Sequence, residues 1–160
     1  MNFATSLLEL IPHQIAVYTR FLNLLHEEQG ALTQSQSVQL ETCTAERTNL
    51  VLALEKYDVE MRTLFISAKI TFSSKGMRQF FNSIAEPHRS ALERQWQQLL
   101  DIATECKKQN AINSKIVDTR RQHTERVLRI LMGQSTLTGT TYAADGRVQS
   151  GTTPATLATA

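Results

Sequence analysis

Proline, glycine and cysteine are scarce in this sequence, and each scarcity excludes a class of protein. The 160 residues include 3 Pro and 6 Gly, too few for the many turns that a fold of short strands requires. The 2 cysteines, Cys43 and Cys106, supply neither a disulfide framework nor a zinc site, and such sparse use fits a reducing compartment. Both lie on predicted helix seams, where a buried thiol acts as a small hydrophobe. We therefore expect long helices without cross-links.

Long apolar runs are also missing. No stretch of about 18 apolar residues is present, so no helix is expected to span a membrane. The first residues carry no Lys or Arg ahead of a short apolar stretch that includes Glu9, which is not the pattern of a secretory signal. Together with the cysteine usage, this predicts a cytoplasmic protein.

Motifs for catalysis and cofactor binding are not found either. The sequence has no Gly-rich phosphate loop and no GxSxG motif. Its histidines follow neither the Glu-x-x-His pattern of di-iron bundles nor the i, i+4 pattern of helical zinc sites. They are His13, His26, His88 and His123. We therefore expect neither an enzyme nor a bound cofactor or metal.

The charge is close to balanced overall but unevenly distributed. Residues 1–60 hold three basic and eight acidic side chains, whereas residues 61–160 hold fourteen basic and seven acidic ones. Such a split favours one half of the chain folding back on the other. Acidic residues interrupt the basic ones between positions 105 and 129, which favours a solvated face or an acidic partner over nucleic acid.

Apolar residues at alternating spacings of three and four predict a first helix with one buried stripe. The stripe consists of Leu8, Ile11, Ile15, Tyr18, Leu22 and Leu25. Pro12 interrupts it, so we expect either a kink or a helix that begins at Pro12. Gly30 and the polar residues 33–37 predict the end of this helix and a turn, with Ser35 or Ser37 capping the next helix.

A second helix follows with a stripe of the same rhythm. The stripe consists of Leu40, Cys43, Arg47, Leu50, Leu54, Tyr57, Met61, Leu64 and Ala68. Arg47 is the one charged residue in this otherwise apolar or aromatic stripe. The rhythm breaks over residues 69–86, where we expect a loop at 73–76 and one or two helical turns over 77–84.

The longest helix is predicted to open at Pro87 and to end near Met132, stopped by Gly133. Its stripe is apolar up to Cys106, mostly polar over residues 109–123, and apolar again near its end. A polar stripe suits a dry core poorly, so we expect the far end of this helix to stand free of the bundle.

These patterns predict an all-α protein, an elongated antiparallel helical hairpin or three-helix bundle with coiled-coil-like packing and a long C-terminal helix. Residues 1–133 form the helical domain. Residues 134–160 are rich in Ser and Thr and poor in large apolar residues, so they are predicted to be a flexible, disordered tail.

A second apolar band near the end of the long helix is the best candidate for a binding surface. It consists of Ile112, Ile116, Val117, Val127, Leu128, Ile130 and Leu131. A partner protein is one explanation for the band. Coverage by the first helix or by a second copy of the chain is the other, and the sequence leaves this choice open.

Three segments resemble the FlgN family of flagellar type III export chaperones, and the resemblance extends over essentially the whole chain. They are Asn110-x-x-Asn113-Ser114-Lys115-Ile116-Val117, Val127-Leu128-x-Ile130-Leu131 and Tyr142-Ala143-Ala144-Asp145-Gly146. Ser114 and Ala143 depart from the family, which often has Gly at these two places.

The resemblance implies a cytoplasmic, non-enzymatic chaperone of flagellum assembly that works with type III secretion. Such a protein binds the C-terminal helical segments of hook–filament junction (hook-associated) proteins, prevents their premature assembly and delivers them to the membrane export gate. The apolar band would bind the client, and Tyr142 with Asp145 and Gly146 would dock the gate protein. The heptads by themselves also fit a structural or adaptor coiled-coil protein that forms a homodimer.

Overall fold

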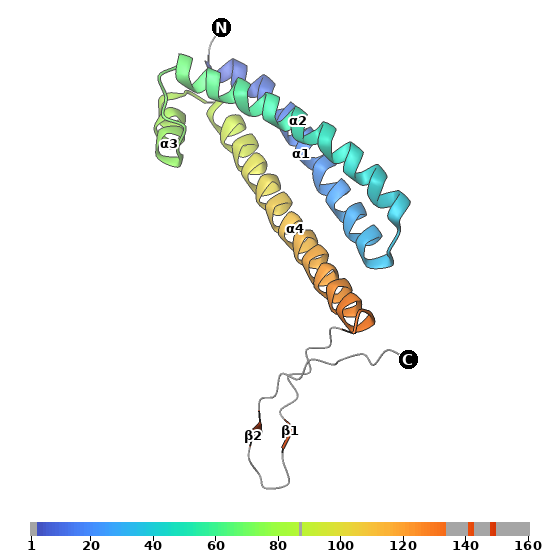
Figure 1. Ribbon diagram of the computed structural model, residues 1–160. Helices are drawn as coiled ribbons and strands as arrows, with labels where there is room; N and C mark the ends of the chain where they lie inside the picture. The colour runs from blue at the N-terminus through green and yellow to red at the C-terminus, as the bar shows by residue number, and fades with distance from the viewer. Residues whose placement is uncertain (1–2, 87, 134–140, 143–147, 150–160) are drawn as a thin grey trace, which may run out of the picture. The chain divides into compact units, whose positions relative to one another are not determined.

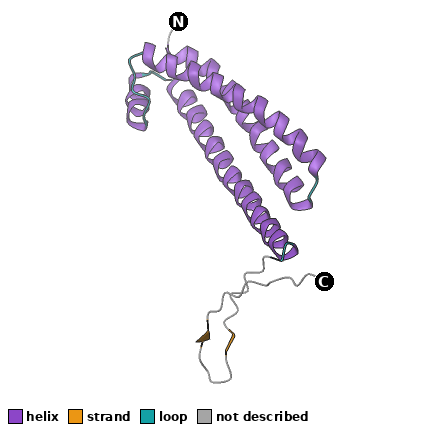
Figure 2. Cartoon of the chain, viewed as in Figure 1, coloured by secondary structure: helices purple, strands orange, loops and turns teal. Residues whose placement is uncertain are grey.

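The computed structural model describes residues 3–86 and 88–133, together with the backbone of residues 141–142 and 148–149. Long helices dominate this part of the chain (Figures 1 and 2). They are α1 (Phe3–Gln34), α2 (Ser37–Ser67), α3 (Ser74–Ser83) and α4 (His88–Leu131). The predicted all-α class is confirmed. Among the described residues, no helix is both long enough and apolar enough to cross a membrane.

The chain divides into two compact units, Met1–Asp118 and Thr119–Ala160. The first unit contains α1, α2, α3 and the greater part of α4. The second contains the last turns of α4 and a pair of short antiparallel strands, β1 (Thr141–Tyr142) and β2 (Val148–Gln149). The remainder of the predicted tail lies outside the described residues.

α1 and α2 form a helical hairpin with a two-residue connection (Figure 1). Ser35 takes a left-handed conformation, with φ 59°, and ends α1, while the backbone N–H of Gln36 donates to the carbonyl of Ala31 at 3.0 Å. The turn was predicted in the right place, but the predicted serine cap is wrong. Gln36 occupies the N-cap without a side-chain hydrogen bond, because Ser35 is used to terminate the preceding helix.

Pro12 lies inside α1, so of the two alternatives predicted there, a kink or a helix that begins at Pro12, the second is wrong. A proline in a helix interior costs about 3 kcal/mol, since it removes one backbone hydrogen bond and crowds the preceding turn. Leu7 and Ile11, just before it, are fully buried. Their burial holds the first turns of α1 in the core, where each side chain contributes about 1.5–3 kcal/mol.

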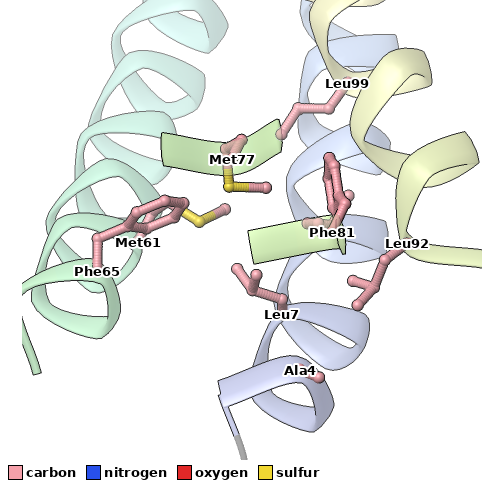
Figure 3. Close-up of a cluster of buried hydrophobic side chains, with 9 residues drawn as sticks. Ala4, Leu7, Met61, Phe65, Met77, Phe81, Leu92 and Leu99 are labelled. Carbon is pink, nitrogen blue, oxygen red and sulfur yellow. The ribbon is translucent and has the colours of Figure 1, made fainter. Parts of the chain in front are cut away.

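The predicted apolar stripes of α1 and α2 face the packed side of each helix, although Leu7, Leu24 and Phe65, which are fully buried, were not among their predicted members. Every residue of both predicted stripes is buried or half-buried in the structure. The main core cluster lies where α1 begins, α2 ends, α3 packs and α4 begins (Figure 3). Its buried members are Ala4, Leu7, Ile11, Met61, Phe65, Met77, Phe81, Leu92 and Leu99. This end of the hairpin is therefore the hydrophobic anchor of the first unit.

α3 closes the core and begins earlier than the sequence predicted. The side chain of Ser73 accepts a hydrogen bond from the backbone N–H of Gly76 at 3.1 Å, and this cap starts the helix at Ser74. Phe65 is fully buried and meets Phe72 of the preceding loop edge-to-face, with ring centroids 4.8 Å apart. Such edge-to-face pairs add about 0.5–1.5 kcal/mol beyond area burial.

Within the first unit, α4 lies beside α1 and runs parallel to it. The Sγ of Cys106 donates to the carbonyl of Tyr18 at 3.4 Å, and the side chain of Asn113 donates to the carbonyl of Leu25 at 2.8 Å. From the first contact to the second, each helix progresses by seven residues in the same direction, so the two helices are parallel. The predicted start of the long helix after residue 86 and its end near residue 132 are confirmed.

Candidate functional site

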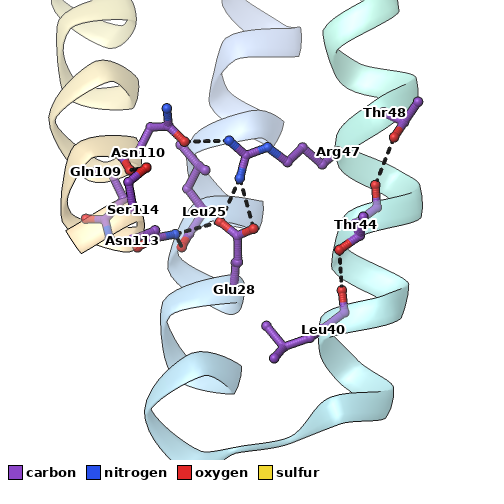
Figure 4. Close-up of polar contacts among 10 residues, drawn as sticks. All are labelled: Leu25, Glu28, Leu40, Thr44, Arg47, Thr48, Gln109, Asn110, Asn113 and Ser114. Atoms are coloured by element: carbon purple, nitrogen blue, oxygen red, sulfur yellow. Dashed lines mark hydrogen bonds and ion pairs between the residues drawn. The ribbon is translucent and has the colours of Figure 1, made fainter. Parts of the chain in front are cut away.

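A cluster of polar side chains joins three helices at the end of the hairpin opposite the hydrophobic core (Figure 4). Arg47 of α2 donates from Nη1 to both carboxylate oxygens of Glu28 in α1, at 2.9 and 3.0 Å. Its Nη2 donates to Oδ1 of Asn110 in α4. The guanidinium also lies 6.0 Å from the centroid of the Phe21 ring, within range of a cation–π interaction. Arg47 therefore contacts both neighbouring helices at once.

Asn113 occupies the most enclosed position of this cluster, with 2% of its surface exposed. Its Nδ2 donates to the carbonyl of Leu25 and to Oε2 of Glu28, each at 2.8 Å. Gln109, also buried, donates to Oδ1 of Asn113 and to Oε1 of Gln29, each at 3.0 Å. Buried polar groups are tolerated when their hydrogen bonds are made, and these bonds are made.

The polar stretch of α4 was therefore only partly understood from the sequence. Because the stripe turns polar at Gln109, we expected the far end of this helix to stand free of the bundle, but Gln109 and Asn113 are buried against α1. The correction has a simple cause: α1 and α2 supply Gln29, Glu28 and Arg47 as polar partners. The polar stripe of α4 therefore packs against α1 and α2 through hydrogen bonds in place of apolar contacts.

The first part of the predicted client-binding band follows directly on this cluster. Ile112 and Val117 are 46% and 48% exposed, and Ile116 is half-buried. Val117 lines a shallow cavity of about 230 Å³ together with Leu32 of α1 and Arg47 of α2. Aliphatic side chains thus border an open pocket at this end of the hairpin.

The second part of the predicted band lies in the last turns of α4, within the second unit. Exposure there ranges from 40% at Val127 and 46% at Leu128 to 61% at Ile130 and 76% at Leu131. Charged residues lie among them, and Glu125 is 3.9 Å from both Arg121 and Arg129. This segment is a helix that presents large aliphatic side chains to solvent, which is the surface type expected of a helix-binding protein.

A comparison of the sequence with known protein families gives a match that extends over nearly the full chain. The FlgN protein family matches residues 1–150. The chain belongs to the FlgN family. The match confirms the resemblance predicted from the sequence. FlgN proteins are chaperones of flagellar export and assembly, and the family is not one of enzymes. Comparisons with curated proteins and with solved structures gave no match.

The residues predicted to dock the export gate are not described by the structure. Only the backbone of Tyr142 is placed, in β1, whereas Asp145 and Gly146 lie outside the described residues. The predicted gate-docking role in this FlgN-family chain therefore remains a prediction.

Both cysteines of this FlgN-family chain are buried and free, as predicted for seam thiols. Burial raises the pKa of the Cys106 thiol to about 11, with a smaller contribution from the negative charge of Glu105. Burial likewise raises the pKa of Cys43. Reactive cysteines need a lowered pKa, so these thiols have the character of packing groups. Among the described residues, no cluster of three His, Cys, Asp or Glu side chains could hold a metal ion.

The polar cluster around Arg47 was not predicted as a unit from the sequence. Arg47 stood out as the single charged residue in its stripe, and Asn110 and Asn113 stood out as a motif, but no pattern linked them. Glu28, an acidic residue in the last turns of α1, could have indicated a partner for Arg47. An antiparallel hairpin brings that part of α1 opposite the first turns of α2.

Proposed function

We propose that this chain is a cytoplasmic flagellar export chaperone whose clients are hook–filament junction (hook-associated) proteins. It binds the C-terminal helical segments of these proteins, prevents their premature assembly and delivers them to the type III export gate. FlgN-family membership supports the chaperone role. The observation that carries the choice of surface is the exposed aliphatic character of α4 from Ile112 to Leu131.

The proposed client surface consists of the exposed or half-buried aliphatic residues of α4. They are Ile112, Ile116, Val117, Val127, Leu128, Ile130 and Leu131. A client helix that lays its apolar face on them removes those side chains from water, at about 25 cal/mol per Å² buried. Charged residues among them, such as Arg121, Glu125 and Arg129, steer the encounter more than they add affinity.

The tail completes the proposed cycle. Residues 134–160 are the Ser/Thr-rich tail that follows the helical domain of residues 1–133 in the chain, and Tyr142, Asp145 and Gly146 dock the membrane gate protein. A client segment that folds on binding pays its ordering entropy at that moment, so its affinity stays moderate and release remains feasible. The proposal involves no nucleic acid, no cofactor and no insertion into the membrane.

Titration calorimetry tests the client assignment. The full-length protein is titrated with synthetic C-terminal segments of the junction proteins encoded by its own source bacterium, and with N-terminal segments of the same proteins as controls. We expect binding of C-terminal segments alone, with a negative heat-capacity change from apolar burial. Absence of binding to every C-terminal segment would overturn the proposal.

Sedimentation at several protein concentrations, together with amide hydrogen exchange, tests the competing hypothesis of a coiled-coil homodimer. A permanent dimer that buries residues 127–131 would protect their amides from hydrogen exchange and would keep its mass on dilution. The chaperone proposal expects these amides to become protected when the client segment is added.

A further inference from the structure

α2 carries a second apolar stripe, on the side that faces away from the core. Its members recur every seven residues through four heptads and are Val38, Ala45, Leu52, Val59 and Ile66. All five are exposed, from 59% at Leu52 and 62% at Val59 to 76% at Val38 and Ile66. We call this set the outer stripe. The stripe occupies one heptad position only, and within α2 the positions three and four residues after each member are polar or charged, so it offers a narrow line of apolar contact with charged flanks.

A groove between α1 and α2 adjoins the outer stripe at one of its members. It has a volume of about 560 Å³, and Val59 of the stripe is part of its wall. Leu10 of α1 and Tyr57 and Leu64 of α2 contribute further apolar surface. A partner helix that lies along the outer stripe therefore has room to place a side chain in this groove, beside Val59.

The surroundings of the stripe and groove are acidic. Glu9 and Glu60 line the groove. Glu41, Glu55 and Arg62 each follow a stripe residue by three positions, which places two carboxylates and one guanidinium on one flank of the stripe.

Three basic residues lie near the stripe, and two of them face carboxylates of their own helix, whereas Lys69 follows the end of α2. Arg62 is paired with Asp58 at 2.8 Å, and Lys56 lies 3.9 Å from Glu60. Five carboxylates therefore stand against three cations near the stripe and groove, a net excess of two negative charges. They are Glu9, Glu41, Glu55, Asp58 and Glu60 against Lys56, Arg62 and Lys69.

We propose that the outer stripe and the adjoining groove form a docking surface for an amphipathic helix of a partner protein, one with apolar residues at heptad spacing and Lys or Arg beside them. The heptad spacing selects a helix, and the flanking carboxylates select basic neighbours. This surface lies on α2 and is separate from the α4 residues of the proposed client site.

Charge argues against a second copy of α2 as the occupant. α2 contains five acidic residues and three basic ones, so two copies packed stripe to stripe would bring like charges together. Repulsion between these carboxylates disfavours a dimer of α2, whereas a partner helix with basic residues beside its apolar positions would be attracted. The partner is therefore expected to be a different, basic helix.

The test uses the full-length protein and two fluorescently labelled synthetic helical peptides. Both peptides carry the same apolar residues at heptad spacing, but Lys flanks them in one peptide and Glu in the other. Fluorescence anisotropy should show binding of the Lys peptide, weakened by added salt, and no binding of the Glu peptide. The substitutions Leu52→Glu and Val59→Glu should each weaken binding about tenfold or more.

Leu100→Glu is the matched control, because Leu100 is a similarly exposed leucine on α4. It should leave the affinity for the Lys peptide unchanged. Circular dichroism should show full helix content for all three variants, since each site is exposed. The proposal is overturned if neither peptide binds, if both bind equally, or if Leu52→Glu and Leu100→Glu have the same effect. Sedimentation of a dimer that Leu52→Glu dissociates would also overturn it, in favour of a second copy.

Discussion

Arg47 of α2 donates a hydrogen bond to Asn110 of α4, although 63 residues separate the two in the chain. The same guanidinium is paired with Glu28 of α1, so one side chain connects three helices. Apolar side chains can slide past one another with modest loss, but this set of hydrogen bonds is complete in one arrangement only. The polar cluster is therefore well suited to fix the register of α4 against the hairpin.

Replacing Arg47 with Ala should lower the free energy of unfolding by about 1–3 kcal/mol. The loss arises because the Glu28 side chain, only 14% exposed, keeps its charge but loses its cation. Urea unfolding followed by circular dichroism measures the change. Arg62→Ala is the control, since its partner Asp58 is well exposed and such pairs contribute about 0–1 kcal/mol. Equal losses in the two variants would contradict the role assigned to Arg47.

Asn113→Asp should destabilise the protein in a pH-dependent manner. The new carboxylate would lie against Glu28, whose Oε2 accepts a hydrogen bond from Asn113 at 2.8 Å. Two adjacent carboxylates raise the folded-state pKa of one of them above its unfolded value. The destabilisation relative to wild type should therefore be large at pH 7 and shrink as the pH falls through that raised pKa.

Ser114→Asp is the matched control for this pH series. Ser114 is exposed, and its hydroxyl donates only to the carbonyl of Asn110 in the same helix. Its unfolding free energy should stay within about 0.5 kcal/mol of wild type. A destabilisation by Asn113→Asp that does not change with pH would argue against carboxylate repulsion.

Two glycine substitutions should shift the melting temperature in opposite directions. A Cβ at Gly76 would collide with the backbone carbonyl of Thr71, so Gly76→Ala should cost about 1–3 kcal/mol through displacement of the loop before α3. A Cβ at Gly30 meets nothing within 4 Å, and Gly30→Ala in α1 should stabilise by about 0.5–1 kcal/mol. Calorimetry on both variants checks the prediction, which fails if Gly76→Ala melts at or above the wild-type temperature.

Cys106 should make stability fall in alkaline solution. Its folded-state pKa, raised by burial to about 11, lies above the value in the unfolded chain. Between about pH 9 and 11 the unfolded chain loses this proton while the folded protein keeps it, so the free energy of unfolding decreases as the pH rises. The decrease should reach about 2–3 kcal/mol. Cys106→Ala should lack this component, and parallel curves for the two proteins would show that the thiol does not contribute.

Val127→Asp and Leu131→Asp should each weaken client binding about tenfold or more without unfolding the protein. Both side chains are exposed, at 40% and 76%, so the free energy of unfolding should change by no more than about 0.5 kcal/mol. Calorimetric titration with the junction-protein segment measures the affinity, and circular dichroism measures the helix content. Loss of helix content in these variants would place the residues in a core instead of a binding surface.

The helices and their buried faces could be predicted because they depend on local spacing. The α2 stripe from Leu40 to Ala68 was predicted with every member buried or half-buried. Pro12 was harder, because local preference disfavours a continuous helix there and only the burial of Leu7 and Ile11 in the assembled core outweighs it. The serine cap failed for a related reason, since Ser35 could serve either helix and the turn assigned it to the first.

The sequence by itself determined that this protein is all-α, where the turn between the first two helices lies, where the longest helix begins and ends, and which family it resembles. All of these follow from hydrophobic periodicity and short motifs, which the chain carries locally. Only the tertiary structure decided that Gln109 and Asn113 lie inside the packed unit, because their burial is tolerable only beside Glu28, Gln29 and Arg47. Those partners are far away in the chain, and the packing of α4 beside the hairpin brings them into hydrogen-bonding distance.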